Sequence, residues 1–350
     1  MGRVDEPFVL GKLPAAHLAR LLTRLPLQDP RVVVGPQVGE DAAVLDMGDR
    51  YLVAKSDPIT FATDAIGWYA VHVNANDVVC TGAAPRWFLC TLLLPEGRAD
   101  VALVDGIFAQ VLQACDEIGA TLVGGHTEIT YGLDRPIVVG GMLGEVDPGH
   151  LVTTAGAQPG DAVLLTQRMA VEATAIIARE KRDELVQRDG LTAGFLDRCA
   201  RFIYQPGISV VRAAQVATAT ASVHAMHDPT EGGLATGLWE LATAAGVGLE
   251  IDAGAVPIYA ETRLLCEIYG LDPWGVIASG SLLLTVDGAD AGSVCDALEG
   301  AGVEASVIGR VVPQEEGVSL RRGSSRGERP SGGSVPLPTF ARDEIARLFE

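Results

Sequence analysis

Short apolar runs alternate with amphipathic stretches along the chain, and turn-rich segments separate them. In the first half the pattern predicts a short helix at 14–25 and then the order β, β, α, β, α, β, β. The predicted strands are 31–34, 51–55, 86–94, 121–124 and 136–146, and the predicted helices are 64–80 and 99–118. This alternation favours a mixed α/β (α+β) fold.

The second half repeats this mixture after a turn-rich boundary at 147–160. Its predicted strands are 162–166, one that begins at 223, 248–251, 281–286 and 303–312, and its predicted helices are 169–180, 192–203, 207–220, 234–245, 258–268 and 289–300. Residues 322–338 are rich in Gly, Ser, Pro and Arg, which predicts a mobile loop or linker before a short helix at 340–349. We therefore expect three parts: 1–150, 151–320 and a tail at 321–350.

The predicted helix 64–80 carries a polar group on an otherwise apolar pattern. Asn74 and Asp77 lie about 60° apart on a helical wheel, so they share a face, whereas Asn76 points elsewhere. Two interpretations stay open. The polar group either makes a helix-to-loop hydrogen bond, or it supplies a carboxylate and amides that hold a metal ion and phosphate oxygens.

Composition narrows the function classes. The 350 residues are 48% hydrophobic and 20% charged, enough for buried cores in two domains or one large one. The formal net charge of −19 argues against nucleic acid as a main partner, because phosphate binding depends on Lys and Arg, but it permits a nucleotide bound with magnesium. The sequence has no apolar run of about 18 residues and no apolar signal segment at its start, so we expect no membrane partner.

The cysteines indicate the redox state of the compartment in which the protein is found. There are six, at positions 80, 90, 115, 199, 266 and 295. None belongs to a CxxC pair, and most lie in apolar helical or strand runs. This distribution predicts reduced, buried thiols in a cytoplasmic protein and argues against a zinc site.

Four short acidic segments are candidate metal ligands, at Asp41, Asp57, Asp77 and Glu128. Asp41 and Asp57 are each predicted at the end of a strand, where loops of α/β proteins usually build sites. The three aspartates are too far apart in sequence for a local calcium loop. Brought together by the fold, they can hold one or two Mg²⁺ ions, with water and phosphate oxygens completing the coordination. Taken singly, each aspartate is better explained as a turn or cap residue.

No Walker A pattern and no GxGxxG motif after the first strand is present, so a bound nucleotide needs another device. We predict that Gly124, Gly125, His126 and Thr127, followed by Glu128, form a Gly-rich turn. The backbone N–H groups of such a turn can cradle phosphates. The alternative is a tight left-handed turn with a helix cap.

A second Gly-rich segment, HDPTEGG at 227–233, opens a predicted helix, so its amides can bind an anion. It also places His227, Asp228 and Glu231 where they can carry out general acid–base chemistry. The alternative is that Asp228 or Thr230 caps the helix.

Five segments, GEDAAVL, KSD, NDVVCTGAAP, GGHTE and MHDPTEGGL, follow one another in an order that resembles the superfamily of aminoimidazole-ribonucleotide (AIR) synthase. That superfamily also contains the hydrogenase-maturation dehydratase HypE, selenophosphate synthetase and thiamine-monophosphate kinase. The resemblance spans roughly residues 10–312 and is closest to AIR-synthase-related, HypE-like proteins. It implies a two-domain PurM-like fold with an N-terminal ATP-binding domain whose sheet pairs across a homodimer. It also implies MgATP bound at the dimer cleft without a P-loop.

The resemblance implies roles for individual residues. Asp41, Asp57 and Asp77 match family positions that hold magnesium and triphosphate. Asn76 matches an asparagine of the dehydratase-like members, whereas Asn74 matches one of the kinase-like members. In the GGHTE segment, this chain resembles selenophosphate synthetase, whereas the dehydratase has an aspartate in place of the histidine.

Two departures from the family are visible in the sequence. HypE ends in a cysteine that carries the reacting group, whereas this chain ends in RLFE and its last cysteine is Cys295. Selenophosphate synthetase uses a reactive Cys or selenocysteine with a lysine near its N-terminus; here Lys12 is present, but no cysteine precedes Cys80.

These features lead to three hypotheses. The first is an ATP-dependent enzyme that phosphorylates, and so activates, an amide or acyl oxygen of an unknown small-molecule or protein-borne acceptor. In it the three aspartates hold Mg²⁺, Lys12 or Lys55 contacts phosphate, and the 227–231 turn faces the acceptor. The second is a small-molecule kinase of the thiamine-phosphate type. The third is a non-catalytic, ATP-binding maturation partner.

Overall fold

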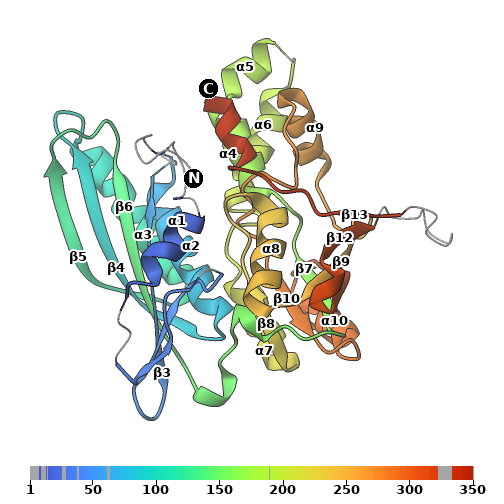
Figure 1. Ribbon diagram of the computed structural model, residues 1–350. Helices are drawn as coiled ribbons and strands as arrows, with labels where there is room; N and C mark the ends of the chain where they lie inside the picture. The colour runs from blue at the N-terminus through green and yellow to red at the C-terminus, as the bar shows by residue number, and fades with distance from the viewer. Residues whose placement is uncertain are drawn as a thin grey trace.

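The computed structural model describes residues 8, 13, 15–25, 29–37, 39–60, 64–188, 190–321 and 333–349. Within these residues it contains two β-sheets, one from each half of the chain, with helices packed against them (Figure 1). The predicted mixed α/β fold is confirmed. None of the helices that these residues form combines the length and the apolar character that a bilayer crossing requires.

The N-terminal sheet has six strands in the order β1-β2-β3-β6-β4-β5. Its strands are β1 (Val32–Val34), β2 (Ala43–Asp46), β3 (Tyr51–Ile59), β4 (Ala84–Pro95), β5 (Thr121–Thr130) and β6 (Ile137–Val146). Only β4 and β5 run parallel; the other neighbouring pairs are antiparallel. A parallel pair needs a crossover connection, and helix α3 (Val101–Ile118) provides it. This connection leaves β5 at the edge of the sheet.

Helix α2 (Ile66–Cys80) lies between the two halves of the molecule. All of its residues except Val73 are buried, because it contacts β3, β4 and β6 of the first sheet as well as α7 and β8 of the second half. A helix that is apolar on all sides is expected in such an enclosed place. Polar side chains on opposite sides of α2 therefore face different halves of the protein.

The C-terminal sheet has seven strands in the order β13-β12-β9-β11-β7-β10-β8. Its strands are β7 (Ala162–Thr166), β8 (Val223–His227), β9 (Gly248–Asp252), β10 (Leu283–Val286), β11 (Ala305–Val312), β12 (Val318–Arg321) and β13 (Ser334–Pro336). Strand β8 lies at the edge that contacts α2. The loop that follows β8 is thereby brought to the junction of the two halves.

The remaining helices surround these sheets (Figure 1). They are α1 (Ala15–Leu22), α4 (Val171–Glu180), α5 (Arg182–Gln187), α6 (Ala193–Ala200), α7 (Val211–Thr220), α8 (Gly233–Ala245), α9 (Ala260–Tyr269) and α10 (Ala291–Gly300). Short 3₁₀-helices are η1 (Pro148–His150), η2 (Thr154–Gly156), η3 (Arg201–Ile203), η4 (Gln314–Glu316) and η5 (Glu344–Phe349).

Two strands continue through residues for which the sequence predicts a strand end or a turn. Strand β3 continues through Asp57 and Pro58, which pair with Gly140 and Val139 of β6. Strand β5 continues through the GGHTE segment, where His126 pairs with Thr91 of β4. The predictions of a strand end at Asp57 and of a turn at GGHTE are wrong, because pairing with a neighbouring strand overrides the local signal of Gly and Pro.

The end of the chain also differs from the prediction. Residues 322–332 of the predicted loop lie outside the described residues, but residues 334–336 form β13, which pairs with β12. The predicted terminal helix is the short 3₁₀-helix η5. This last segment packs against the C-terminal half, where Leu337 and Leu348 are buried.

Candidate functional site

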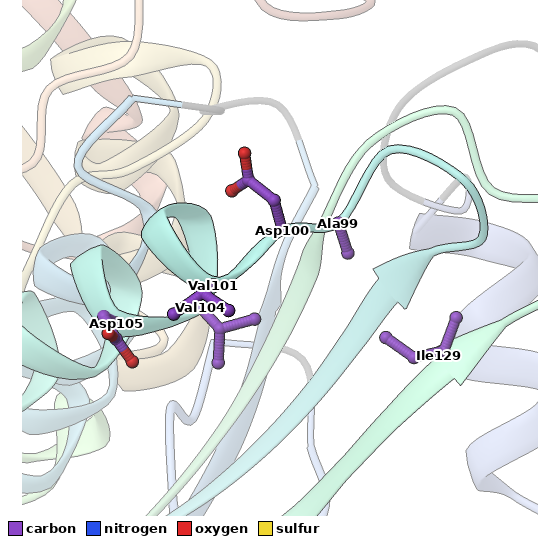
Figure 2. A pocket seen from close by; sticks show the side chains of 6 residues that line it. All are labelled: Ala99, Asp100, Val101, Val104, Asp105 and Ile129. Atoms are coloured by element: carbon purple, nitrogen blue, oxygen red, sulfur yellow. The ribbon is translucent and has the colours of Figure 1, made fainter.

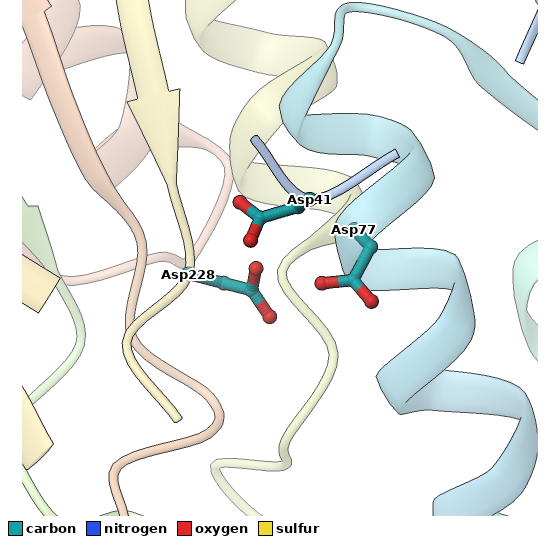
Figure 3. A group of neighbouring side chains, drawn as sticks. All are labelled: Asp41, Asp77 and Asp228. Atoms are coloured by element: carbon teal, nitrogen blue, oxygen red, sulfur yellow. The ribbon is translucent and has the colours of Figure 1, made fainter. Parts of the chain in front are cut away.

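Three aspartates from distant segments meet at the junction of the two halves (Figure 3). Asp41 lies in the loop before β2, Asp77 in the last turn of α2, and Asp228 directly after β8. One carboxylate oxygen of each lies within 4.8 Å of the other two. We call these three residues the acidic centre. The fold thus brings Asp41 and Asp77 together as predicted, and adds Asp228, for which the sequence suggested acid–base chemistry.

The acidic centre brings three carboxylates into a largely buried place. Burial is the main cause that raises the pKa of Asp77 and of Asp228; the next cause is the charge of Asp228 for Asp77, and of Asp41 for Asp228. Asp228 Oδ2 is buried and has no hydrogen-bond partner among the described residues. Buried polar atoms normally have a partner. A hard divalent cation that binds carboxylate oxygens, such as Mg²⁺, fits this donor set.

Lys55 on β3 adds a positive charge beside the acidic centre. Its Nζ lies 2.9 Å from Asp77 Oδ2 and 3.3 Å from Asp57 Oδ2. Burial alone would lower the pKa of Lys55, but the charges of Asp77 and Asp57 outweigh it and raise the pKa, so the ammonium stays charged. Lys12, the other predicted phosphate ligand, lies outside the described residues.

Asp57 occupies a different place from the one predicted. Its side chain is 40% exposed and pairs with Lys55, and it does not belong to the acidic centre. The reason is the extension of β3. In a strand, residues two positions apart point to the same face, so Asp57 lies beside Lys55, whose ammonium contacts both Asp57 and Asp77.

His227, at the end of β8, links Asp41 to helix α8. Its Nδ1 lies 2.8 Å from Asp41 Oδ2, and its Nε2 lies 3.0 Å from Glu240 Oε2. Burial alone would lower the pKa of His227, but these two carboxylates raise it well above its usual value, so the ring donates from both nitrogens. The side chain of His227 is 3% exposed and lies between the carboxylates of Asp41 and Glu240.

The two asparagines of α2 connect the helix to its surroundings. Asn74 Oδ1 accepts from the backbone N–H of Asp57 at 2.8 Å, and its amide donates to the carbonyl of Ala70 at 2.8 Å. Asn76 donates to the carbonyl of Ile208 at 2.8 Å and accepts from the N–H of Val210 at 2.9 Å. Backbone groups thus take the place of the predicted cofactor contacts, which supports the structural interpretation of these side chains.

The GGHTE segment forms no phosphate cradle in the described structure. Strand pairing with β4 replaces the predicted turn of Gly124, Gly125, His126 and Thr127. At Gly125 (φ +145°) a Cβ atom would come within 1.8 Å of the carbonyl oxygen of Cys90, so close strand packing explains this glycine. His126 Nε2 lies 3.2 Å from Glu128 Oε2, and both side chains are exposed. Glu128 is not a member of the acidic centre.

The turn after β8 depends on its glycines. Gly232 and Gly233 have φ values of +80° and +68°, in the left-handed region that glycine adopts without strain. A Cβ atom on Gly233 would come within 2.5 Å of the carbonyl oxygen of Trp274. Gly232 is the N-cap of α8, so neither Asp228 nor Thr230 occupies the N-cap position that the sequence suggested for them.

The sequence analysis missed three acidic residues near the site. Glu240 on α8 holds His227, and Asp343 near the C-terminus accepts a hydrogen bond from the N–H of Gly232. Glu172 on α4 is 5% exposed, and burial raises its pKa to about 8 despite hydrogen bonds from Ser279. A charged residue inside an apolar helical pattern is the signal that could have identified Glu172 and Glu240.

Two open cavities lie away from the acidic centre. One, of about 360 Å³, lies between the start of α3 and strand β5, where Asp100, Val101 and Ile129 line it (Figure 2). The other, of about 480 Å³, lies on the C-terminal sheet and includes Glu250 and Arg310. No residue of the acidic centre lines either cavity.

Comparisons with known proteins agree with the two-part structure. The family described as "AIR synthase related protein, N-terminal domain" matches residues 39–146. The family described as "AIR synthase related protein, C-terminal domain" matches residues 158–321. The acidic centre thus takes two of its carboxylates from the first match and one from the second.

One curated relative and two solved structures extend this likeness. The carbamoyl dehydratase HypE of Cupriavidus necator is 31% identical over 325 residues, which are 89% of this chain and 86% of HypE. A crystal structure of the hydrogenase maturation protein HypE in complex with ATP has a TM-score of 0.68 and 26% identity, covering 95% of this chain and 96% of the other. The crystal structure of a HypE–HypF complex gives a TM-score of 0.74 at 20% identity, covering 93% and 99% of the two chains.

Proposed function

The chain belongs to the AIR synthase related family, and we propose on this basis that it binds MgATP and uses it to activate an amide or acyl oxygen of an acceptor. The name of the carbamoyl dehydratase relative supports this reaction class, and the similar HypE structure determined with ATP supports the cofactor. The observation that carries the proposal is the acidic centre with Lys55 beside it. Three carboxylates that share one small volume, two of them buried, provide the oxygen ligands that Mg²⁺ requires.

Each residue of the site has a proposed role. Asp41, Asp77 and Asp228 hold Mg²⁺, which offsets the charge of the phosphate oxygens when it is bound. Lys55 keeps its charge at neutral pH and contacts phosphate once the nucleotide is present. His227 fixes the orientation of Asp41 through its bond to Glu240. Glu231, in the turn next to Asp228, stays the candidate that faces the acceptor.

The chemistry is a phosphoryl transfer. The acceptor oxygen forms a bond to the γ-phosphorus while the bond from that phosphorus to the β,γ-bridging oxygen breaks, and ADP leaves. The phosphorylated oxygen is then a leaving group for substitution or dehydration. Positioning and charge stabilisation supply most of the rate enhancement in such reactions, which matches a site built from carboxylates and a partly buried lysine.

We propose that the acceptor comes from another molecule. The six cysteines are free thiols, and five of them are buried. The sixth, Cys295, is partly buried on α10. Buried thiols are poorly placed to carry a reacting group, which supports an acceptor from another molecule. Free thiols are stable in a reducing compartment, so we keep the cytoplasm as the proposed location.

We also propose that the protein is a homodimer that pairs through the N-terminal sheet. Strand β5 is an edge strand of ten residues, most of them exposed, and it presents Val123 and Ile129 at 52% and 56% exposure. A long exposed edge strand is a template for pairing with another chain. Sedimentation of the wild type and of Val123→Lys tests this: we expect a dimer that the charged side chain weakens. A monomeric wild type at micromolar concentration would exclude the dimer.

Thermal unfolding with and without MgATP tests the proposed function. A ligand at about 100 times its Kd adds about 2.7 kcal/mol to the free energy of unfolding, so we expect MgATP to raise the Tm of the wild type by several degrees. Asp77→Asn should lose most of this increase, whereas the exposed Asp296→Asn on α10 should keep it. If MgATP leaves the wild-type Tm unchanged, the acidic centre is not a nucleotide site.

A further inference from the structure

The last described residues, 337–349, form what we call the C-terminal strap. In Figure 1 the strap continues from β13 across the C-terminal half and ends beside α4. The N–H of Leu337 donates to Val318, and Leu348 is buried among residues of α4 and α9. Arg347 donates to the carbonyl of Gly270 at 3.0 Å. The strap is therefore anchored at both ends, and Asp343 is held between these anchors.

The carboxylate of Asp343 joins three segments of the chain. Its Oδ2 accepts from the N–H of Gly232 at 2.7 Å, and its Oδ1 accepts from the N–H groups of Ile277 at 3.2 Å and of Ile345 at 2.8 Å. Both oxygens thus face N–H donors. An amide of the same size would have to turn its NH₂ group toward one of these donors, so asparagine cannot replace aspartate here without losing a hydrogen bond.

The bond to Gly232 is made where the backbone of the turn is left-handed and helix α8 begins. Gly232 and Gly233 are consecutive left-handed residues, and the N-cap Gly232 has no side chain that could cap α8. The first N–H groups of a helix need partners from outside it, and Asp343 supplies one. The 274–278 loop holds the same turn through the bond from the N–H of Ala278 to Thr230, at 3.2 Å. The carboxylate of Asp343 links the turn to that loop through Ile277.

We infer that Asp343 is a positioning residue that fixes the 228–233 turn so that Asp228 completes the acidic centre. Asp228 is the first residue of this turn, four residues before the N–H that Asp343 holds. A metal ligand acts only when its orientation is fixed, and groups that orient ligands typically contribute 10–100-fold to metal affinity. The inference deepens the proposed function and rests on the metal site proposed there.

Titration with Mn²⁺ alone, followed by the electron paramagnetic resonance signal of the free ion, tests the inference. Asp343→Asn should weaken Mn²⁺ binding by about tenfold or more. The matched control is Glu344→Gln, which changes the adjacent strap residue. Glu344 accepts from the N–H of Asp272 and pairs with Arg347, away from the turn. We expect the control to bind Mn²⁺ within about twofold of the wild type.

A second measurement needs no variant. If the strap strengthens metal binding, then by linkage metal binding must strengthen the strap to the same extent. Amide hydrogen exchange of wild-type peptides that contain residues 337–349 should therefore become slower when Mn²⁺ is added. Exchange over α3, a helix of the N-terminal half that does not belong to the strap, serves as the internal reference.

The outcomes are distinct. Weaker Mn²⁺ binding in Asp343→Asn alone, with slower strap exchange in the wild type, supports the positioning role. Equal losses in Asp343→Asn and Glu344→Gln would show that the strap contributes only to general stability and would overturn it. Unchanged affinity in Asp343→Asn, or strap exchange that ignores Mn²⁺, would overturn it while leaving the proposed function intact. A wild type that binds neither Mn²⁺ nor MgATP would overturn both.

Discussion

The acidic centre and the GGHTE segment of β5 share residue types but lie in opposite structural environments. Both are acidic and lie beside glycines, and both qualified as ligand sites by composition. In the acidic centre, two of the three carboxylates are buried and face one another across chain segments. On β5, His126 and Glu128 pair with each other at 66% and 55% side-chain exposure. Residue type is therefore a weaker guide to chemistry than the environment that the fold provides.

The consequence is electrostatic. Charges in water interact weakly and are screened, whereas buried charges interact strongly and shift pKa values. The pKa values of Asp77 and Asp228 are raised by burial first and then by neighbouring carboxylates. Neighbouring buried carboxylates favour a bound cation, because the cation offsets the repulsion between their charges.

The largest expected effect is on turnover at the acidic centre. Asp77→Asn removes one negative ligand, and a metal ion that polarises phosphate contributes several kcal/mol to the transition state, so ADP release with a suitable acceptor should fall by at least about 100-fold. The control Asp296→Asn should retain wild-type turnover. Normal ADP release by Asp77→Asn would show that the acidic centre has no part in the mechanism. The acidic centre would then be no more functional than the GGHTE segment of β5.

The second effect is on stability. His227→Leu leaves Asp41 and Glu240 without their shared partner, and breaking a buried pair in this way is costly; because both carboxylates are partly exposed, we expect a loss of about 2 kcal/mol in the free energy of unfolding. Urea unfolding at pH 7 measures it. His150→Leu, at an exposed position, should change stability by less than about 0.5 kcal/mol. Equal losses of stability in His227→Leu and His150→Leu would mean that the bonds of His227 to Asp41 and Glu240 contribute no more than the contact of an exposed histidine.

The third effect is a pH dependence. The pKa of Glu172 rises from 4.5 to about 8 on folding, mainly through burial. The folded protein therefore binds a proton that the unfolded chain releases between these values, and the contribution of Glu172 to stability falls as the pH rises through that window. Between pH 5 and pH 8, the free energy of unfolding of Glu172→Gln should rise relative to that of the wild type by about 1.5 kcal/mol. This value is smaller than the full pKa shift implies, because the folded protein can relax around the charged carboxylate.

Urea unfolding of both proteins across this pH range measures the difference. The control is Glu96→Gln, which changes an exposed carboxyl after β4. If the difference in free energy of unfolding between Glu172→Gln and the wild type stays constant across this pH range, burial does not raise the pKa of Glu172.

The smallest effect is expected on β5. Glu128→Gln removes an exposed charge whose partner, His126, is also exposed, and such pairs contribute between 0 and about 1 kcal/mol. We expect a change below about 0.5 kcal/mol in stability and below about twofold in ADP release. A loss of activity comparable to that of Asp77→Asn would place β5 in the site, for example through a dimer partner, and would break the comparison between the two regions.

The sequence alone determined many of the local elements and the residue types that meet at the acidic centre. Helix α2, long strands such as β6, and the acidic segments at Asp41 and Asp77 were all predicted, because hydrophobic periodicity and residue type are properties of neighbouring positions. The order of the short motifs was enough to indicate the family that the comparisons then showed.

The tertiary structure decided which polar groups meet. His227 and Asp41 are 186 residues apart in sequence, and Asn76 bonds to a residue 132 positions away. No local pattern encodes such pairs, because they depend on how the two sheets enclose α2. The strand at GGHTE is decided in the same way, by the pairing with β4. The sequence thus provided the carboxylates, and the packing of distant segments determined which of them are buried together and can share a metal ion.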